Sequence, residues 1–224
     1  PRTSSAASDV YKRQGMLFEL SRGYLRVVAT DGHRLAMETL SITDDLNETI
    51  QLILPRKGVI ELVKLLGEGG KVDLTFGRSH LRAEVSGFTF TSKLVDGSFP
   101  DYNRVIPKGG DKIVVGDVNY LKQGFLRASI LSNEKYRGVR IMLTKGEVQI
   151  LANNPEQEEA EESVSVDYDG DPLEMAINVG YVIDVLSTVR SKQVRISLSD
   201  ASSSALIEEV SGGDALYVVM PMRL

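Results

Sequence analysis

A histidine, a nearby aspartate and a run of glutamates are the residues with the clearest potential for chemistry. Asp31 and His33 flank Gly32, and five glutamates fall between positions 156 and 162. An Asp–His pair can act in general acid–base catalysis, and clustered carboxylates can hold a divalent cation. One hypothesis is therefore a metal-dependent hydrolase that uses Asp31, His33 and the glutamate run.

The remaining equipment for catalysis is sparse. The chain has two histidines, His33 and His80, and no cysteine, which excludes thiolate metal sites and disulfides. A turn glycine separates Asp31 from His33, so their side chains are not expected to aim at each other, and no serine has a recognisable nucleophile setting. We therefore expect no catalytic residue, no metal and no cofactor. A turn-stabilising histidine and a solvated, aggregation-resistant strand edge are the simpler interpretations.

The composition is typical of a globular protein. The 224 residues suffice for one large domain or two of ordinary size, with 42% hydrophobic and 25% charged residues. No stretch reaches the roughly 18 apolar residues that a membrane span needs, and no signal segment is visible. Without cysteine, the chain fits a reducing cytoplasm. A net charge of −5 argues against a tight nucleic-acid binder.

Apolar periodicity predicts a chain made mostly of strands. Alternation favours strands over 16–20, 24–29, 33–40, 50–54, 72–76, 81–85 and 88–94, and over 113–115, 140–143, 148–152, 164–166, 175–177, 194–198, 205–210 and 216–220. Helical spacing predicts one helix after Pro55 and two more behind the capping residues Asp117 and Asn178. The order strand, helix and three strands at 50–94 recurs at 175–220. The repeat predicts two similar α+β domains of helices against antiparallel sheet.

Composition also divides the chain. Residues 1–14 follow neither period, and we interpret them as a disordered or foreign tail. Pro100, Pro107 and the Gly109-Gly110 pair mark a link. We expect one domain over 15–101, truncated at its start because only one helix precedes the link, and a second over 102–224.

Five motifs carry a family resemblance. They are VVATDGHRLA at 27–36, TSKLVDGSFPDY at 91–102, ILSNEKYRGVR at 130–140, ANNPEQEEAEE at 152–162 and YVVMPMRL at 217–224. In their amino-acid sequence and in their order along the chain, they resemble motifs of the bacterial sliding clamps, the beta subunits of DNA polymerase III. The resemblance runs from about residue 15 to residue 224. It implies the DNA-clamp fold, with most of the second and all of the third domain of a three-domain chain.

In that family two chains form a ring, with helices lining the hole and sheets outside, which holds the polymerase on duplex DNA. The family resemblance therefore implies a non-catalytic processivity factor in the bacterial cytoplasm, at the nucleoid. A ring needs little direct affinity for DNA, so the negative net charge is no obstacle. Basic residues on or after the predicted helices, otherwise a solvated face, would be DNA-facing: Arg56, Lys57, Lys122, Arg127, Lys135, Arg137 and Arg140.

The C-terminal segment is apolar, and Pro221 is expected to stop strand pairing so that the last residues leave the sheet. Such a tail either packs on its own domain or lines a groove, for which methionine is well suited. The resemblance implies a hydrophobic cleft between the two domains for short peptides of polymerases and the clamp loader. Its residues would be Thr30, Gly32, His33, Arg34, Leu35, Pro100, Arg104, Val105, Asn178, Tyr181, Ser204, Val218, Val219, Met220, Pro221, Met222, Arg223 and Leu224. Ser202 stands where an apolar residue is common.

The glutamate run gains a third interpretation from the resemblance, as one side of the subunit interface of the ring. It would pair with a basic first domain of the neighbouring chain. The interface residues would be Ile130, Leu131, Glu156, Glu158, Glu159, Glu161 and Glu162. Without its own first domain this chain is expected not to close a ring and to be mainly monomeric. A stand-alone peptide-binding module without a DNA role is the alternative.

Overall fold

The structure is a computed structural model that describes residues 15–43, 48–67 and 71–223. The predicted tail over 1–14 and the predicted cleft residue Leu224 lie outside the described residues. The chain divides into two compact units, residues 1–102 and 103–224. Each unit has its own cluster of buried apolar side chains.

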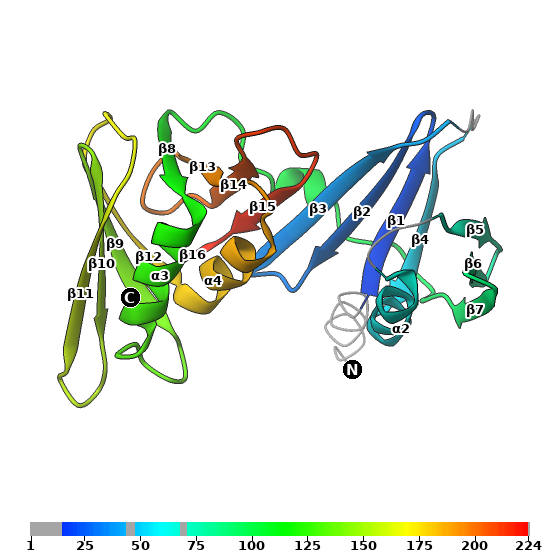
Figure 1. The fold of residues 1–224 in the computed structure, drawn as a ribbon, viewed down its shortest axis with the longest axis horizontal. Coiled ribbons are helices and arrows are strands. Elements are labelled where there is room, and N and C mark those ends of the chain that lie inside the picture. The colour runs from blue at the N-terminus through cyan, green and yellow to red at the C-terminus, as the bar shows by residue number, and fades with distance from the viewer. Residues whose placement is uncertain (1–14, 44–47, 68–70, 224) are drawn as a thin grey trace, which may run out of the picture. The chain divides into compact units, whose positions relative to one another are not determined.

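The first unit contains two antiparallel sheets. Strands β1 (Gly15–Ser21), β2 (Tyr24–Thr30), β3 (Arg34–Ser41) and β4 (Ile50–Pro55) pair in the order β4-β1-β2-β3. Helix α2 (Arg56–Leu66) follows β4, and β5 (Asp73–Phe76), β6 (His80–Val85) and β7 (Phe88–Lys93) form a three-stranded sheet. Figure 1 shows the order of these elements along the chain.

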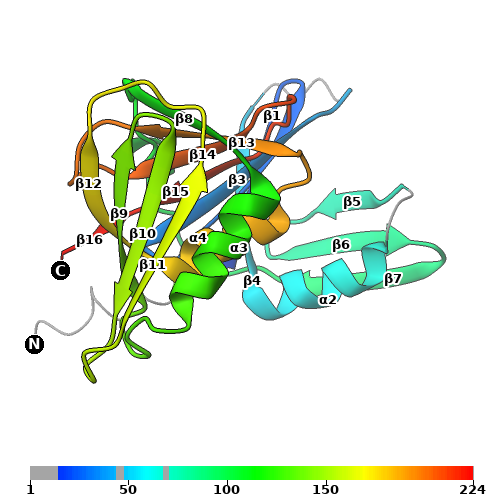
Figure 2. The same cartoon turned by 60° about the vertical axis from the view of Figure 1, so that its left-hand side comes forward.

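Helix α2 packs against both sheets of the first unit. Its Leu62 joins a buried cluster with Leu54 of β4 and Leu81 of β6, and Figure 2 shows α2 alongside the three-stranded sheet. Gly58 permits this close packing, because a Cβ atom there would lie 2.7 Å from Ser92 Oγ and 3.0 Å from Leu54 Cδ1. The helix begins directly after Pro55, as predicted.

The second unit also holds two sheets, both antiparallel. After η1 (Tyr102–Arg104), its strands are β8 (Lys112–Asp117), β9 (Gly138–Thr144), β10 (Glu147–Asn153), β11 (Glu159–Ser165), β12 (Leu173–Asn178), β13 (Gln193–Leu198), β14 (Ala205–Glu209), β15 (Leu216–Val219) and β16 (Pro221–Met222). They pair in the orders β15-β14-β13-β8 and β11-β10-β9-β12-β16. Helix α3 (Val118–Ser129) follows β8, and α4 (Val179–Thr188) follows β12.

Both helices of the second unit start at the capping residues that the sequence predicts. Asp117 Oδ1 accepts hydrogen bonds from the backbone N–H groups of Asn119 and Tyr120, at 2.9 and 3.2 Å. Asn178 Oδ1 does the same at α4. The helices pack side by side and bury apolar faces in one core, which leaves a cavity of about 30 Å³ lined only by apolar side chains.

The predicted α+β class, with antiparallel sheets and three helices, is confirmed. One detail at the C-terminus differs from prediction. The chain does leave the β15 sheet near Pro221, but it then pairs with β12 of the other sheet, with Ile177 opposite Pro221 and Ala176 opposite Met222. Proline is tolerated there because β16 is an edge strand and needs no backbone N–H on its outer side. No helix among the described residues is long and apolar enough to cross a membrane.

Candidate functional site

The C-terminal tail passes from one sheet of the second unit to the other. Val218 and Val219 are completely buried, whereas Met220, Pro221 and Met222 are half-buried and Arg223 is exposed. Ser204 precedes Ala205, whose register partner is Val219, so Ser204 lies beside Met220. Of the predicted C-terminal cleft residues that the structure describes, Met220 to Arg223 therefore have accessible surface.

Met222 and Arg223 form one side of a surface pocket of about 450 Å³ within the second unit. The other lining residues come from two loop regions and the start of β9: Asn133, Tyr136, Gly138, Asn153, Asn154 and Pro155. The pocket combines a thioether, an exposed aromatic ring, amides and a guanidinium. Such a mixture suits a peptide side chain with an apolar body and a polar end. The lining residues from these loops were not predicted to line the cleft, although all of them lie inside the recognised motifs over 130–140 and 152–162.

Asn178 fixes one wall of this pocket to the start of α4. Its Oδ1 accepts from Gly180 N at 2.9 Å and Tyr181 N at 3.3 Å, while its Nδ2 donates to the Tyr136 carbonyl oxygen at 3.2 Å. Val179 N also donates to the Arg137 carbonyl at 2.8 Å. The structure thus brings together Asn178, Tyr181 and the tail, three parts of the predicted cleft, because β16 pairs with the residues just before Asn178.

Arg137 adopts a left-handed backbone conformation at the end of the same loop, with φ of 49°. Its N–H donates to the Asn133 carbonyl at 2.7 Å, and Asn133 Oδ1 accepts from the N–H groups of Lys135 and Tyr136. A positive φ is unfavourable for a side chain with a Cβ. The loop is therefore held in one conformation by hydrogen bonds at both of its ends.

Five other predicted cleft residues gather in one turn of the first unit, between β2 and β3. Thr30 Oγ1 donates to the Arg34 carbonyl at 2.8 Å and accepts from Gly32 N at 3.1 Å. Gly32 has φ of 90°, a conformation that favours glycine. His33 is exposed and Arg34 half-buried, while Leu35 is buried with 2% of its surface exposed.

The carboxylate of Asp31, in the same turn, accepts hydrogen bonds from backbone N–H groups and from the Arg34 side chain. Asp31 Oδ1 accepts from His33 N at 2.9 Å and Arg34 N at 3.0 Å, and Oδ2 accepts from Arg34 Nε at 3.1 Å. Partial burial acts to raise the pKa of Asp31, but these hydrogen bonds outweigh it and leave the pKa lowered. Asp31 thus serves the turn. In the part of the chain that the structure describes, no group of acidic or histidine side chains is arranged to hold a metal ion.

The predicted cleft residues Pro100, Arg104 and Val105 flank a buried anchor of the first unit at Tyr102. The Tyr102 hydroxyl donates to Glu19 Oε1 at 3.0 Å and accepts from Arg26 Nη1 at 3.1 Å. Burial, the leading cause, raises the pKa of Tyr102. Pro100 and Arg104 are exposed and Val105 is half-buried. This network fixes the residue from which the chain passes into the second unit.

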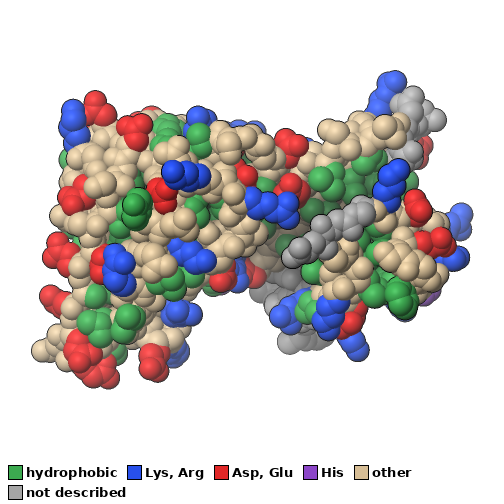
Figure 3. Space-filling model, in the orientation of Figure 1, with side chains coloured by type: hydrophobic (Ala, Val, Ile, Leu, Met, Phe, Trp, Pro, Cys, Tyr) green, Lys and Arg blue, Asp and Glu red, His purple; other side chains and the backbone are tan. Residues whose placement is uncertain are grey.

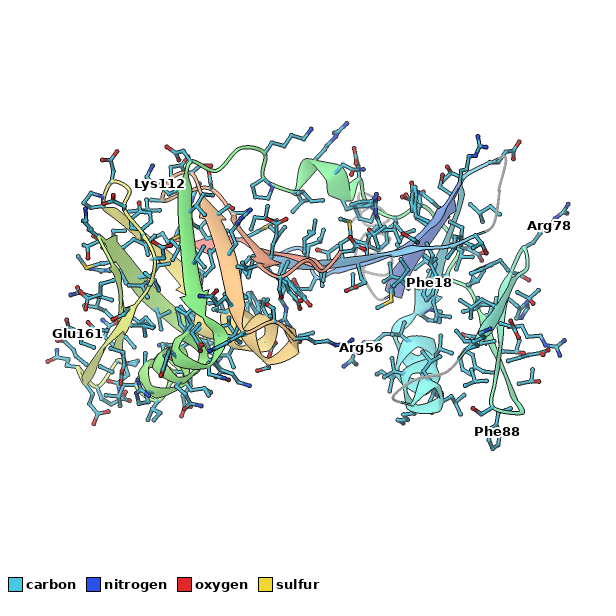
Figure 4. All side chains as sticks on the ribbon, turned by 45° about the horizontal axis from the view of Figure 1, so that its top comes forward. Phe18, Arg56, Arg78, Phe88, Lys112 and Glu161 are labelled. Carbon is cyan, nitrogen blue, oxygen red and sulfur yellow. The ribbon has the colours of Figure 1, made fainter. Side chains whose placement is uncertain are left out.

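The predicted DNA-facing residues fall into several settings. Arg56 and Lys57 are exposed in the first turn of α2, where Figure 4 shows Arg56 extending outward. Lys122 and Arg127 are the charged residues of α3. Lys135 Nζ lies 5.2 Å from the Tyr136 ring centroid, and Arg137 is exposed.

Arg140 lies on a strand, as predicted for 140–143, and not on a helix. It projects from β9 and pairs with Glu174 of β12 at 3.2 Å. Its neighbours Val139 and Ile141 are buried in the core that contains α3. Because successive side chains of a strand point to opposite faces, Arg140 faces away from the helices.

Three of the predicted interface residues, Glu159, Glu161 and Glu162, lie on β11, an edge strand of the five-stranded sheet. Glu159 and Glu161 are exposed, and Figure 4 shows Glu161 pointing away from the sheet. Acidic side chains gather at the lower left of Figure 3, over the turn with Glu156 and Glu158. Ile130, just after α3, is 76% exposed, and Leu131 is half-buried. An unpaired strand edge, negative charge and an exposed apolar side chain therefore occur together.

Comparison with known families accounts for both units. Residues 3–101 match the family described as DNA polymerase III beta subunit, central domain, and residues 103–223 match the family described as DNA polymerase III beta subunit, C-terminal domain. The first match begins inside the segment predicted to be a tail. Together the two matches span nearly the whole chain.

Relatives and solved structures agree with these matches. The chain is 56% identical to a beta sliding clamp of Pseudomonas putida, in a match that covers 100% of this chain and 62% of the relative. It is 51% identical to the beta sliding clamp of Escherichia coli K12, in a match that covers 99% of this chain and 61% of the relative. It superimposes on the DNA polymerase III subunit beta of Pseudomonas aeruginosa with a TM-score of 0.93 at 56% identity, over 96% of this chain and 59% of the other. A Bartonella birtlesii sliding clamp bound to griselimycin gives a TM-score of 0.90 at 35% identity, over 99% and 60%. The chain therefore belongs to the family of DNA polymerase III beta subunits.

Proposed function

We propose that this chain is part of a DNA sliding clamp, a non-catalytic subunit that encircles duplex DNA and confers processivity on a replicative polymerase. The observation that carries the proposal is the match to both beta-subunit domains across the chain, at 56% identity to a beta sliding clamp. The chain spans about three fifths of the length of such relatives, so the activity belongs to the longer protein. Because the proposed partner is bacterial DNA, the clamp would act in the cytoplasm, at the nucleoid.

The two units would be the central and C-terminal domains of that clamp, over 15–101 and 102–224, with the central domain truncated at its start. Lys and Arg residues of the helices would centre the duplex through weak phosphate contacts. The exposed positions of Arg56 and Lys57 on α2 support this role. Arg140 is the weakest of the predicted contacts because it lies on a sheet face.

Polymerase and clamp-loader peptides would bind at the C-terminal tail. The support within the second unit is the pocket beside Met222 and Arg223, together with the accessible Met220 and Pro221. Buried anchor residues in preformed pockets dominate peptide affinity, so a tail that is half-buried and held against β12 is a suitable platform. The turn residues Thr30 to Leu35 would complete the cleft from the first unit.

A fluorescent peptide with an apolar C-terminal anchor tests the peptide site by polarisation. Deletion of residues 220–224 should abolish binding, and Met222→Ala should weaken it about tenfold, the loss of about 1.4 kcal/mol of contact energy. Tyr120→Ala, which removes a 71% exposed side chain from α3, serves as control and should bind as the parent does. Unchanged affinity after the deletion would exclude the tail as the peptide site.

The acidic edge at β11, with Ile130 and Leu131, would be one side of the subunit interface, matched by a basic surface of the neighbouring chain. Its support is the unpaired backbone of an edge strand beside exposed glutamates. Such edges readily accept a further strand from another chain. Sedimentation of this chain alone should give a monomer, and a stable dimer that survives 0.5 M salt would contradict an interface that needs a separate basic partner.

A further inference from the structure

Arg127 of α3 and Glu162 of β11 form a two-pronged ion pair within the second unit. Arg127 Nε donates to Glu162 Oε1 at 2.7 Å, and Arg127 Nη2 donates to Oε2 at 2.7 Å. Bidentate pairing of a guanidinium with a carboxylate is the strongest geometry available to these groups. The pairing raises the pKa of Arg127 and lowers the pKa of Glu162, so both groups stay charged.

A glycine in α3 makes the pair possible. A Cβ atom at Gly124 would lie 2.6 Å from Val164 Cγ2, so only glycine lets the helix approach β11 this closely. Arg127 follows Gly124 by one turn of the helix, and Glu162 precedes Val164 on the same face of the strand. The contact is therefore set by the packing of the helix and not by two flexible side chains meeting at random.

The pair changes the charge that α3 presents. Lys122 and Arg127 are the charged residues of this helix, and Glu162 cancels one of the two. Exposed ion pairs add little to stability, and 53% of the Arg127 side chain is accessible. We therefore expect the pair to affect ligand binding by α3 more than the stability of the fold.

We propose that Glu162 masks Arg127 and so keeps the direct contact of α3 with DNA weak. The inference rests on the proposed function, in which α3 faces the duplex. Glu162 occupies two of the five N–H donors of Arg127 and neutralises its charge, so a phosphate that approaches Arg127 meets a weaker attraction than at a free guanidinium. Each phosphate contact adds about 0.9 to the slope of log affinity against log salt concentration, and many such contacts would hold a sliding protein in place.

The neighbouring glutamate provides a matched control. Glu161 is exposed on the opposite face of β11, turned away from α3. Glu161→Gln and Glu162→Gln change the net charge equally, but only the second removes the partner of Arg127. A difference between the two variants therefore reports the release of Arg127 and not a general change in charge.

Binding of a short fluorescein-labelled DNA duplex to this chain, measured from 20 to 200 mM salt, tests the proposal. Glu162→Gln should bind several-fold more tightly than Glu161→Gln, with a salt slope steeper by about 0.9. Arg127→Gln alone should leave the parent slope unchanged, and Arg127→Gln combined with Glu162→Gln should return to it. Equal binding by the two glutamate variants would overturn the mask.

Lys122→Gln separates that failure from a failure of the proposed function. A weaker, less salt-dependent complex with Lys122→Gln places α3 at the DNA, so that equal glutamate variants then refute the mask alone. A duplex affinity that no α3 or β11 variant changes would refute the DNA-facing assignment of α3 and the mask together. Circular dichroism of each variant should match the parent.

Discussion

Replacing Asn178 by aspartate or serine should separate two roles of this side chain. The Oδ1 atom caps α4, whereas the Nδ2 atom donates to the Tyr136 carbonyl and holds the 133–137 loop. Aspartate and serine are equally good caps, but neither offers an amide donor to that carbonyl. We expect both variants to preserve α4 and to release the loop that forms one wall of the tail pocket.

The expected magnitudes follow from the two sets of contacts. Loss of an N-cap costs about 1 kcal/mol. Loss of one neutral hydrogen bond costs about 0.5–1.5 kcal/mol. Asn178→Ala loses both and should be destabilised by about 2 kcal/mol, whereas Asn178→Ser loses only the second. Asn178→Asp gains about 0.3–1 kcal/mol from a negative charge at a helix N-terminus, but its carboxylate also repels the Tyr136 carbonyl oxygen, so it should release the loop more fully than serine does.

Urea unfolding, hydrogen exchange and peptide titration together test this prediction. Exchange should accelerate over 133–138 but not over α4 in the aspartate and serine variants, and peptide affinity should fall with the loop. Unchanged exchange over 133–138 would show that Asn178 does not hold the loop. Equal destabilisation by serine and alanine would refute the capping role.

Three further perturbations address other contacts. Tyr102→Phe removes a hydroxyl donor 3.0 Å from the buried Glu19 carboxylate and should lower stability by about 1.5–3 kcal/mol in urea unfolding. Gly124→Ala should destabilise the chain by up to about 2 kcal/mol, although alanine favours helices, because its Cβ would lie 2.6 Å from Val164 Cγ2. Hydrogen bonds from the Ser202 hydroxyl, the Ser202 N–H and the Ser203 hydroxyl lower the pKa of Asp200 to about 2. The Asp200 carboxylate therefore stabilises its turn above about pH 4, and this contribution is lost as the pH falls toward 2.

For each of these three predictions, one result would contradict the reasoning. Tyr120→Phe, which changes an exposed ring, is the control for Tyr102→Phe. Equal stability of the two variants in urea unfolding would show that the hydrogen bonds at Glu19 do not stabilise the fold. A gain in stability from Gly124→Ala would mean that helix propensity outweighs the close approach to β11. An NMR titration midpoint for Asp200 near the ordinary pKa of about 3.9 would show that its serine hydrogen bonds do not persist in solution.

Local contacts were predictable from the sequence and contacts between distant segments were not. Asp117 and Asn178 act on N–H groups two or three residues away, so the caps follow from local order along the chain. Pairing of Pro221 with Ile177 depends on a register between segments 44 residues apart in sequence, which periodicity does not contain. The pocket likewise arises where two loop regions and the tail meet in space. The family motifs identified the tail residues of the site, but they did not indicate which loops lie beside the tail.

The Arg127–Glu162 pair shows the same limit in electrostatics. The sequence assigned Arg127 to DNA and Glu162 to a subunit interface, because each charge was interpreted within its own segment. The two residues are 35 positions apart and meet only because Gly124 lets α3 lie close to β11. Counting charges along a chain therefore overestimates the cations that a helix can offer to a ligand.

The acidic edge of β11 also restricts symmetry. Two copies of this strand cannot pair with each other without bringing the glutamates of one copy, among them Glu159 and Glu161, beside those of the other, which is unfavourable between neighbouring strands. A contact made by the same patch on both partners is thus disfavoured, and an interface at this edge would require a different surface on the neighbouring chain. Contacts between unlike surfaces repeat from chain to chain, and they form a closed ring when the rotation closes and an open filament when it does not.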